Sequence, residues 1–198
     1  MIGAEIPAEP VKTAVAIIRK NDQYGQPFCS GTLISNTMVL AAAHCFEEDD
    51  PTNIKVVAGE MNMAWGTKGV TRGVKSLKIH PDYKHIMDKR IVKEGKNDIE
   101  EVRVQLIDGD LALLELDQPL DLENNDNIAK AELPTLSMKL TNKLIQIGGW
   151  GRTTTFTSSQ TSPDFLSINI TVKPSEECSE TYKEGSFFAD RYFIGIIS

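Results

Sequence analysis

The stretch Cys29–Cys45, CSGTLISNTMVLAAAHC, decides the fold class. Apolar and β-branched residues in this stretch and directly before it form two short runs, Phe28–Ser35 and Thr37–Ala43, which are separated by a turn at Ser35–Asn36. Short runs of this kind between turn residues are typical of paired β-strands. We therefore predict a β-hairpin whose second strand leads directly into His44.

Similar runs occur along the rest of the chain. Further predicted strands are Val11–Lys20, Asn53–Ala58, Val70–Ile79, Leu111–Leu116, Leu144–Ile147, Ser167–Lys173 and Tyr192–Ile197. Six short strands before residue 117 with little helix indicate a closed barrel or a sandwich. The polar stretch from Asp117 to Lys130 is interpreted as a connection between two halves. A helix is predicted to start at Pro174–Glu177, where Ser175 can cap the first amides.

Composition excludes several classes of protein. The 198 residues carry 21 Lys+Arg against 28 Asp+Glu, a net charge of −7, which argues against binding to nucleic acid or to an anionic membrane. The acidic cluster Glu47–Asp50 is interpreted as a solvated face. No apolar run approaches the ~20 residues of a membrane span, and residues 1–10 show no signal peptide.

The three cysteines fit either a reduced chain or an oxidised chain with one thiol unpaired.

Four segments together carry the chemistry. They are Cys29–Ser35, Met38–Cys45, Asp110–Leu116 with His80–Tyr83 before it, and Gly149–Gly151. In this order they resemble the chymotrypsin/trypsin family of serine proteases, from about residue 2 to about residue 178. The resemblance implies an all-β fold of two six-stranded β-barrels. We expect residues 1–117 to form the first barrel, with His44 and Asp110, and residues 118–198 to form a linker and an incomplete second barrel.

The resemblance also assigns roles to two residues. His44 matches the general base, which takes a proton from a serine hydroxyl and returns it to the leaving amine. Asp110 matches the acid that orients this base, and a carboxylate at the mouth of an apolar strand is costly unless a partner such as His44 hydrogen-bonds it. Asp98, in Asn-Asp-Ile, is a rival, but Glu100 and Glu101 follow it instead of apolar residues. Asp108 is a third candidate.

The family pattern further implies a disulfide between Cys29 and Cys45. The two cysteines flank a hairpin and can meet across it, and in the chain-entropy model a bridge over ~15 residues stabilises by about 3 kcal/mol. The alternative is a pair of buried free thiols. Because the bridge accounts for both cysteines, and because no compact ligand spacing includes His80 or His85, we expect no metal site and no cofactor.

The resemblance breaks where the family places its nucleophile. The 198 residues contain no Gly-Asp-Ser-Gly-Gly segment, and Ser198 has no flanking glycines. Cys178 resembles the first cysteine of a second disulfide, but Ile194 stands where its partner is expected. Met1-Ile2-Gly3-Ala4 resembles an altered mature start. We therefore expect a truncated chain that is inactive by itself, with no nucleophile of its own.

The same resemblance implies a function, a location and a class of partners. It implies a secreted serine endopeptidase that acts on protein or peptide substrates, with protein protease inhibitors as further partners. The alternative is a non-catalytic protease homologue that acts as a binding or regulatory module. The segment Asp82–Gly109 is longer than the family predicts, and we interpret it as a charged loop near the cleft. Arg90-Ile91-Val92 within it is either a proteolytic nicking site or a chance resemblance in a solvated insertion.

Overall fold

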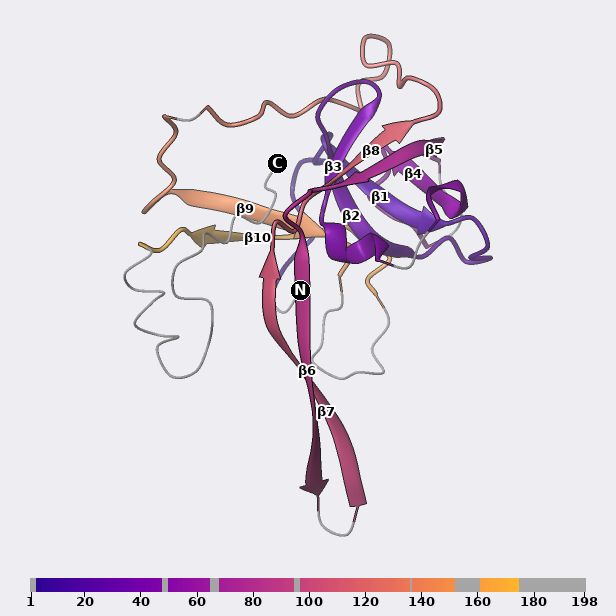
Figure 1. Ribbon diagram of the computed structural model, residues 1–198. Coiled ribbons are helices and arrows are strands. Elements are labelled where there is room, and N and C mark those ends of the chain that lie inside the picture. The colour runs from indigo at the N-terminus through magenta and orange to yellow at the C-terminus, as the bar shows by residue number, and fades with distance from the viewer. Residues whose placement is uncertain are drawn as a thin grey trace.

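Six strands between residues 14 and 116 close into a β-barrel (Figure 1). The computed structural model describes residues 3–47, 50–64, 68–94, 97–135, 137–151 and 161–174, and only the backbone of residues 87–94 and 97–106. The barrel strands are β1 (Ala14–Arg19), β2 (Pro27–Leu33), β3 (Met38–Ala41), β4 (Ile54–Ala58), β5 (Val70–Ile79) and β8 (Ala112–Leu116). They pair antiparallel in the order β1-β2-β3-β8-β5-β4, and β1 closes the ring by pairing with β4 as well as β2. The predicted barrel is thereby confirmed.

Strand β1 is apolar on both faces because each face packs against a different cluster. Successive side chains of a strand point to opposite sides. Val15 and Ile17 point into the barrel, where they pack in the larger core cluster. Ala14, Ala16 and Ile18 belong to a second cluster that also contains Val57, Met63, Trp150 and Phe165. The first strand therefore links the barrel to the second half of the chain.

The described part of the second half is a two-stranded antiparallel sheet of β9 (Leu144–Gly149) and β10 (Leu166–Thr171). Trp150 follows β9, and its ring meets the Phe165 ring edge-on, with centroids 4.9 Å apart. Within the described residues the second barrel is incomplete, as the sequence predicted. The helix expected from Pro174 onward and the strand expected at 192–197 lie outside the described part of the chain.

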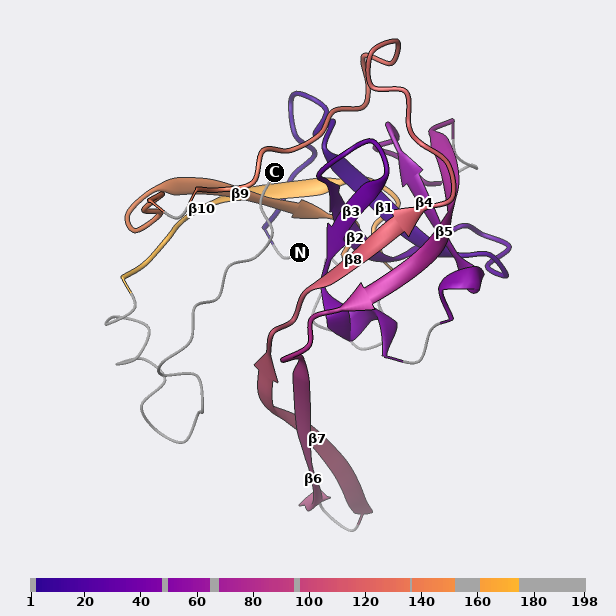
Figure 2. The same ribbon diagram turned by 45° about the horizontal axis from the view of Figure 1, so that its top comes forward.

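The segment interpreted as a charged loop is instead a long hairpin, and that prediction is wrong. Strands β6 (Lys84–Glu94) and β7 (Asn97–Asp108) pair along their whole length and form their own two-stranded sheet. In both ribbon views the hairpin extends away from the barrel (Figures 1 and 2). Arg90 lies in β6 opposite Glu101, so the hypothetical nicking site has strand backbone rather than loop backbone.

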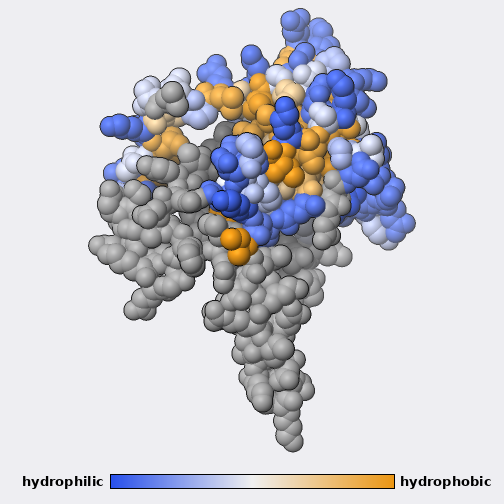
Figure 3. All heavy atoms as spheres, viewed as in Figure 1, coloured by the Kyte–Doolittle hydropathy of each residue, from blue (hydrophilic) through white to orange (hydrophobic). Residues whose placement is uncertain are grey.

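Apolar surface on the barrel side of the molecule is divided by hydrophilic groups (Figure 3). The large exposed apolar side chains come from distant parts of the chain, among them Ile6, Tyr24, Leu133 and Leu144. Scattered apolar residues of this kind are normal on a protein surface. Among the residues that the structure describes, no helix has the length and apolar character needed to cross a membrane.

Candidate active site

His44 lies in a short 3₁₀ turn, η1 (Ala43–Phe46), directly after β3. Ala43 and Phe46 are buried and fix the turn to the barrel core. The Phe46 ring meets the Phe28 ring of β2 edge-on, with centroids 6.1 Å apart. The His44 side chain points outward and is 48% exposed. A firmly packed turn thus presents an accessible imidazole.

Asp110 lies at the entrance to β8, and Gly109 sets its position. Gly109 has a φ of 57°, in the left-handed region that glycine adopts without strain. A Cβ at this position would also lie 2.9 Å from the carbonyl carbon of Asp82, so the space excludes a side chain. The close turn at Gly109 directs Asp110 toward η1.

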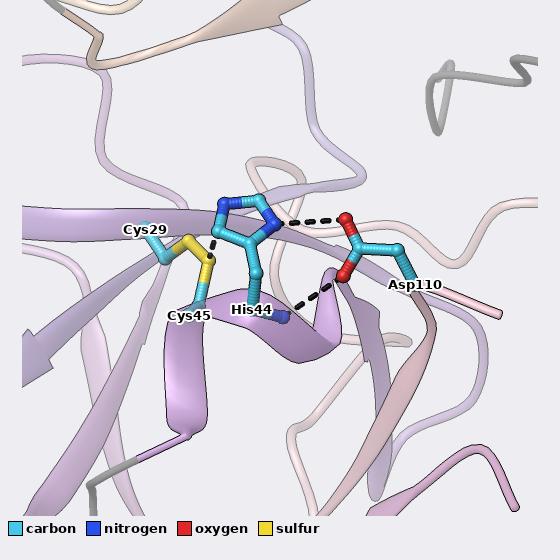
Figure 4. Close-up of a disulfide and its surroundings, with 4 residues drawn as sticks. All are labelled: Cys29, His44, Cys45 and Asp110. Atoms are coloured by element: carbon cyan, nitrogen blue, oxygen red, sulfur yellow. Dashed lines mark hydrogen bonds and ion pairs between the residues drawn. A yellow bond between two sulfur atoms is a disulfide. The ribbon is translucent and has the colours of Figure 1, made fainter. Parts of the chain in front are cut away.

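The carboxylate of Asp110 holds His44 at two points (Figure 4). Asp110 Oδ2 lies 2.8 Å from His44 Nδ1, and Oδ1 accepts the backbone N–H of His44, also at 2.8 Å. A carboxylate facing Nδ1 selects the tautomer that carries its proton there. The lone pair is then on Nε2, so this imidazole can accept a proton at Nε2 while Asp110 stabilises the resulting cation. The contact between His44 and Asp110 expected from the sequence is present.

The structure places the two rival residues differently from Asp110. Asp98 lies opposite Lys93 near the far end of the β6–β7 hairpin. Ten residues of strand separate it from Asp108, a span of roughly 33 Å at the usual rise per residue. Asp108 accepts a hydrogen bond from the backbone N–H of Gly109. The geometry therefore favours Asp110 among the three candidates.

Cys29 and Cys45 form the predicted disulfide beside His44. Their Cα atoms are 6.3 Å apart, and the bridge joins β2 to η1. Cys45 Sγ lies 3.8 Å from His44 Nε2. The ligand atoms of Cys29, His44 and Cys45 all lie within 4.8 Å of one another. In the disulfide neither sulfur is a thiolate, the form in which cysteine binds metal ions.

A second polar cluster adjoins the dyad and was missed from the sequence. Glu47 follows η1, and its Oε1 accepts a hydrogen bond from Tyr83 Oη and lies 2.7 Å from His85 Nδ1. The bond from Tyr83, and then that from His85, lower the pKa of Glu47. Burial, followed by the bond to Glu47, raises the pKa of Tyr83. The cluster ties the turn that carries His44 to the base of the β6–β7 hairpin.

Comparison with known proteins identifies the family. The sequence model of the Trypsin family matches residues 3–195. The chain belongs to the trypsin family of serine proteases.

The chain aligns with only part of the length of the trypsin-family members that it matches. It is 30% identical to a trypsin of Phaedon cochleariae over 174 residues, which cover 85% of this chain and 58% of the relative. It is 31% identical to trypsin I-P1 of Gallus gallus, over 88% of this chain and 59% of the relative. It is 29% identical to submandibular glandular kallikrein-9 of Rattus norvegicus, over 80% of this chain and 56% of the relative. The chain therefore spans less than two thirds of the length of these curated relatives.

The fold of this trypsin-family chain also matches a solved structure. The crystal structure of the scabies mite inactivated protease paralogue S-D1 superimposes with a TM-score of 0.71. The match covers 97% of this chain and 71% of that one, at 23% sequence identity. At this identity the comparison shows a shared fold, which agrees with the trypsin-like all-β architecture predicted from the sequence.

The Gly149–Gly151 segment of the trypsin-family pattern serves close packing. A Cβ at Gly149 would lie 2.7 Å from Ser30 Oγ. Gly149 thus lets β9 approach the residue after Cys29.

The other residues of the family pattern lie outside the described part of the chain. These are Met1, Ile2, Cys178, Ile194 and Ser198. The predictions made for them, including the unpaired state of Cys178, therefore stay predictions.

Proposed function

We propose that the protein to which this chain belongs is a secreted trypsin-like serine endopeptidase with His44 as general base and Asp110 as the residue that orients it. The observation that carries the proposal is the 2.8 Å contact between Asp110 Oδ2 and His44 Nδ1 in a trypsin-family barrel. Its partners are protein or peptide substrates, together with protein protease inhibitors. The Cys29–Cys45 disulfide supports secretion, because disulfides persist in oxidising compartments.

The proposed mechanism uses the free nitrogen of His44. As a serine hydroxyl attacks the carbonyl carbon of a peptide bond, Nε2 takes the hydroxyl proton and Asp110 stabilises the imidazolium. Nε2 then gives the proton to the leaving amine, which leaves an acyl-enzyme. A water molecule, deprotonated by the same nitrogen, releases the acid and restores the serine. The 48% exposure of His44 is consistent with a base that must meet its substrate.

We infer that the 198-residue chain by itself does not supply the nucleophile that this mechanism requires. It contains no Gly-Asp-Ser-Gly-Gly segment, which in this family also provides the oxyanion-hole amides. Loss of one oxyanion donor alone slows such reactions by ~10²–10³. We propose that the isolated chain does not hydrolyse peptides. A fluorophosphonate probe should leave it unlabelled, and stoichiometric labelling would refute this part of the proposal.

The absent serine segment also favours a second candidate, a non-catalytic homologue that binds a partner. Sequencing the transcript beyond codon 198 and expressing the protein it encodes separates the two. If that protein is an enzyme, it reacts with the fluorophosphonate, His44→Ala abolishes the reaction and His80→Ala preserves it. His80 is a suitable control because its Nδ1 accepts the backbone N–H of Asp82 instead of a bond from a residue of the dyad. A folded product that binds a protein and never reacts would establish the second candidate.

A further inference from the structure

Two potential metal ligands, Cys29 and Cys45, lie beside His44, which is itself a third. The ligand atoms of Cys29, His44 and Cys45 lie within 4.8 Å of one another, and His44 Nε2 is 3.8 Å from Cys45 Sγ. Figure 4 shows the imidazole between the disulfide on one side and Asp110 on the other. In the oxidised protein the two sulfurs are bonded to each other. Reduction of this single bond would leave two thiols and an imidazole nitrogen facing one small volume.

The spacing of these atoms fits a tetrahedral zinc ion. Zinc binds thiolate sulfur at about 2.3 Å and imidazole nitrogen at about 2.0–2.1 Å, so its ligands lie about 3.8 Å apart for two sulfurs and about 3.6 Å apart for nitrogen and sulfur. The observed 3.8 Å between His44 Nε2 and Cys45 Sγ matches this within about 0.2 Å. The Cα atoms of Cys29 and Cys45 are 6.3 Å apart, so each side chain can direct its sulfur to a shared ion.

Asp110 supplies the outer contact that zinc-bound histidines need. A histidine that binds zinc almost always donates its other ring N–H to a carboxylate, a backbone carbonyl or water, which fixes the ring and raises its basicity. Asp110 Oδ2 lies 2.8 Å from Nδ1, so Nε2 is the nitrogen left to bind a metal. Since half of the His44 side chain is exposed, an ion has a path to the site and water can fill the fourth position.

We propose that reduction of the Cys29–Cys45 disulfide creates a zinc site with Cys29 Sγ, Cys45 Sγ and His44 Nε2 as ligands. With a dithiol as reductant, the S–S bond of the protein breaks, two electrons and two protons pass to the cysteine sulfurs, and the dithiol becomes a cyclic disulfide. Zn²⁺ then replaces one proton on each thiol, and two protons enter the solvent. The imidazole contributes its lone pair without change of protonation.

A zinc ion at this site would prevent His44 from acting as the proposed general base. The nitrogen that binds zinc is the one that must accept the serine proton, so the reduced, zinc-loaded dyad cannot serve as a base. This consequence rests on the proposed function. Metal binding itself does not, and it can be measured on the 198-residue chain without any assay of hydrolysis.

The test uses the 198-residue chain with Cys178→Ser, which leaves Cys29 and Cys45 as its only thiols. A trialkylphosphine reduces the disulfide, taking up oxygen from water as the phosphine oxide, and excess reagent is removed without air. Titration with Co²⁺ reports the ligands through thiolate-to-cobalt charge-transfer absorption and the intense visible bands of tetrahedral cobalt. We expect one ion per chain, displacement of cobalt by Zn²⁺, and no such bands for the oxidised protein.

Variants distinguish a folded site from chelation by an unfolded chain. His44→Ala should weaken binding at least tenfold, and Asp110→Asn should weaken it about 10- to 100-fold through its effect on the imidazole. Asp110 is 66 residues from His44 in the sequence, so it can influence binding only in the folded protein. His80→Ala is the matched control and should leave the affinity unchanged. The proposal is overturned if reduction unfolds the chain, if no tetrahedral spectrum forms, or if Asp110→Asn binds like its parent.

Discussion

Asp110→Asn changes the charge of the residue beside His44 while nearly preserving its shape. In the native pair both carboxylate oxygens accept hydrogen bonds, one from Nδ1–H and one from the backbone N–H of His44. Asparagine retains one oxygen, and its amide nitrogen can only donate. The backbone N–H cannot reverse its role, so the oxygen stays with it and the NH₂ group faces Nδ1. Nδ1 must then carry the lone pair, and the ring proton moves to Nε2.

The size of this effect follows from the bond that is lost. A hydrogen bond to a charged group contributes about 1.5–3 kcal/mol net. The His44 side chain is 48% exposed, so water competes and the lower end of this range applies. About 1.4 kcal/mol corresponds to a tenfold change in an equilibrium. The lost bond alone should shift the tautomer ratio of neutral His44 toward Nε2–H by about tenfold, and the bond that the asparagine NH₂ group donates to Nδ1 adds to this shift.

Long-range ¹H–¹⁵N correlation spectra measure the tautomer directly. The chain contains only three histidines, so a ¹⁵N-histidine-labelled sample gives a simple spectrum in which His44→Ala assigns the signal of interest. The parent should show Nδ1–H and the Asp110→Asn variant Nε2–H, while His80 keeps its pattern in both. If Asp110→Asn retains the Nδ1–H tautomer, the carboxylate does not orient this imidazole, and the proposed base loses its support.

Three further predictions concern the packing and the electrostatics around the site. Gly148→Ala should lower the free energy of unfolding by about 1–3 kcal/mol in urea titrations, because its Cβ would overlap the buried Phe165 ring; equal midpoints for variant and parent would contradict this. The raised pKa of Tyr83 should make it ionise above the pH range of an ordinary tyrosine, and Tyr83→Phe should remove that step from the ultraviolet titration. Since its folded pKa exceeds the unfolded value, this tyrosine stabilises the fold up to about pH 10, and the stabilisation is lost as the pH rises further; a Tyr83→Phe titration that keeps the high-pH step would contradict the cluster with Glu47. Limited trypsin digestion should show no early cleavage after Arg90, because its backbone is paired in a strand; a fast first cut there would contradict the hairpin.

The barrel could be predicted from sequence because its strands carry their own signals. Val70–Ile79 was delimited correctly from its apolar pattern alone. Strand β8 is buried at Ala112, Leu114 and Leu116 and only partly covered between them, the alternation of a barrel wall. Strand β1 is apolar on both faces because Trp150 and Phe165 cover its outer side. Burial of this kind can be recognised in the sequence because apolar residues occupy the buried positions.

The β6–β7 hairpin could not be recognised in the same way because it lies apart from the barrel core. Its many charges suggested a solvated loop. The backbone register nevertheless pairs the two strands along their whole length. The alternation Val102, Val104, Leu106 was the one signal from which a strand could have been inferred.

The cluster around Glu47 was missed for a different reason. The acidic run that begins at Glu47 has the composition of a solvated face, and no local pattern distinguishes its first member from the rest. The distinction arises only in space, where Tyr83 and His85 converge on one carboxylate oxygen from 36 and 38 residues away. Such convergence depends on where the base of the hairpin lies relative to η1. A single sequence does not contain that information.

The His44–Asp110 contact is in the end a product of strand register. Strands β3 and β8 pair with Ala41 opposite Ala112, so the residues that follow β3 and those that precede β8 emerge at the same end of the barrel. A slip of one residue would turn Leu114, which is fully buried, away from the interior and turn Glu115 into it. The apolar side of β8 therefore fixes the register, and the register brings a carboxylate and an imidazole 66 residues apart in sequence to 2.8 Å. The core of the barrel therefore sets the distance between the two residues of the dyad.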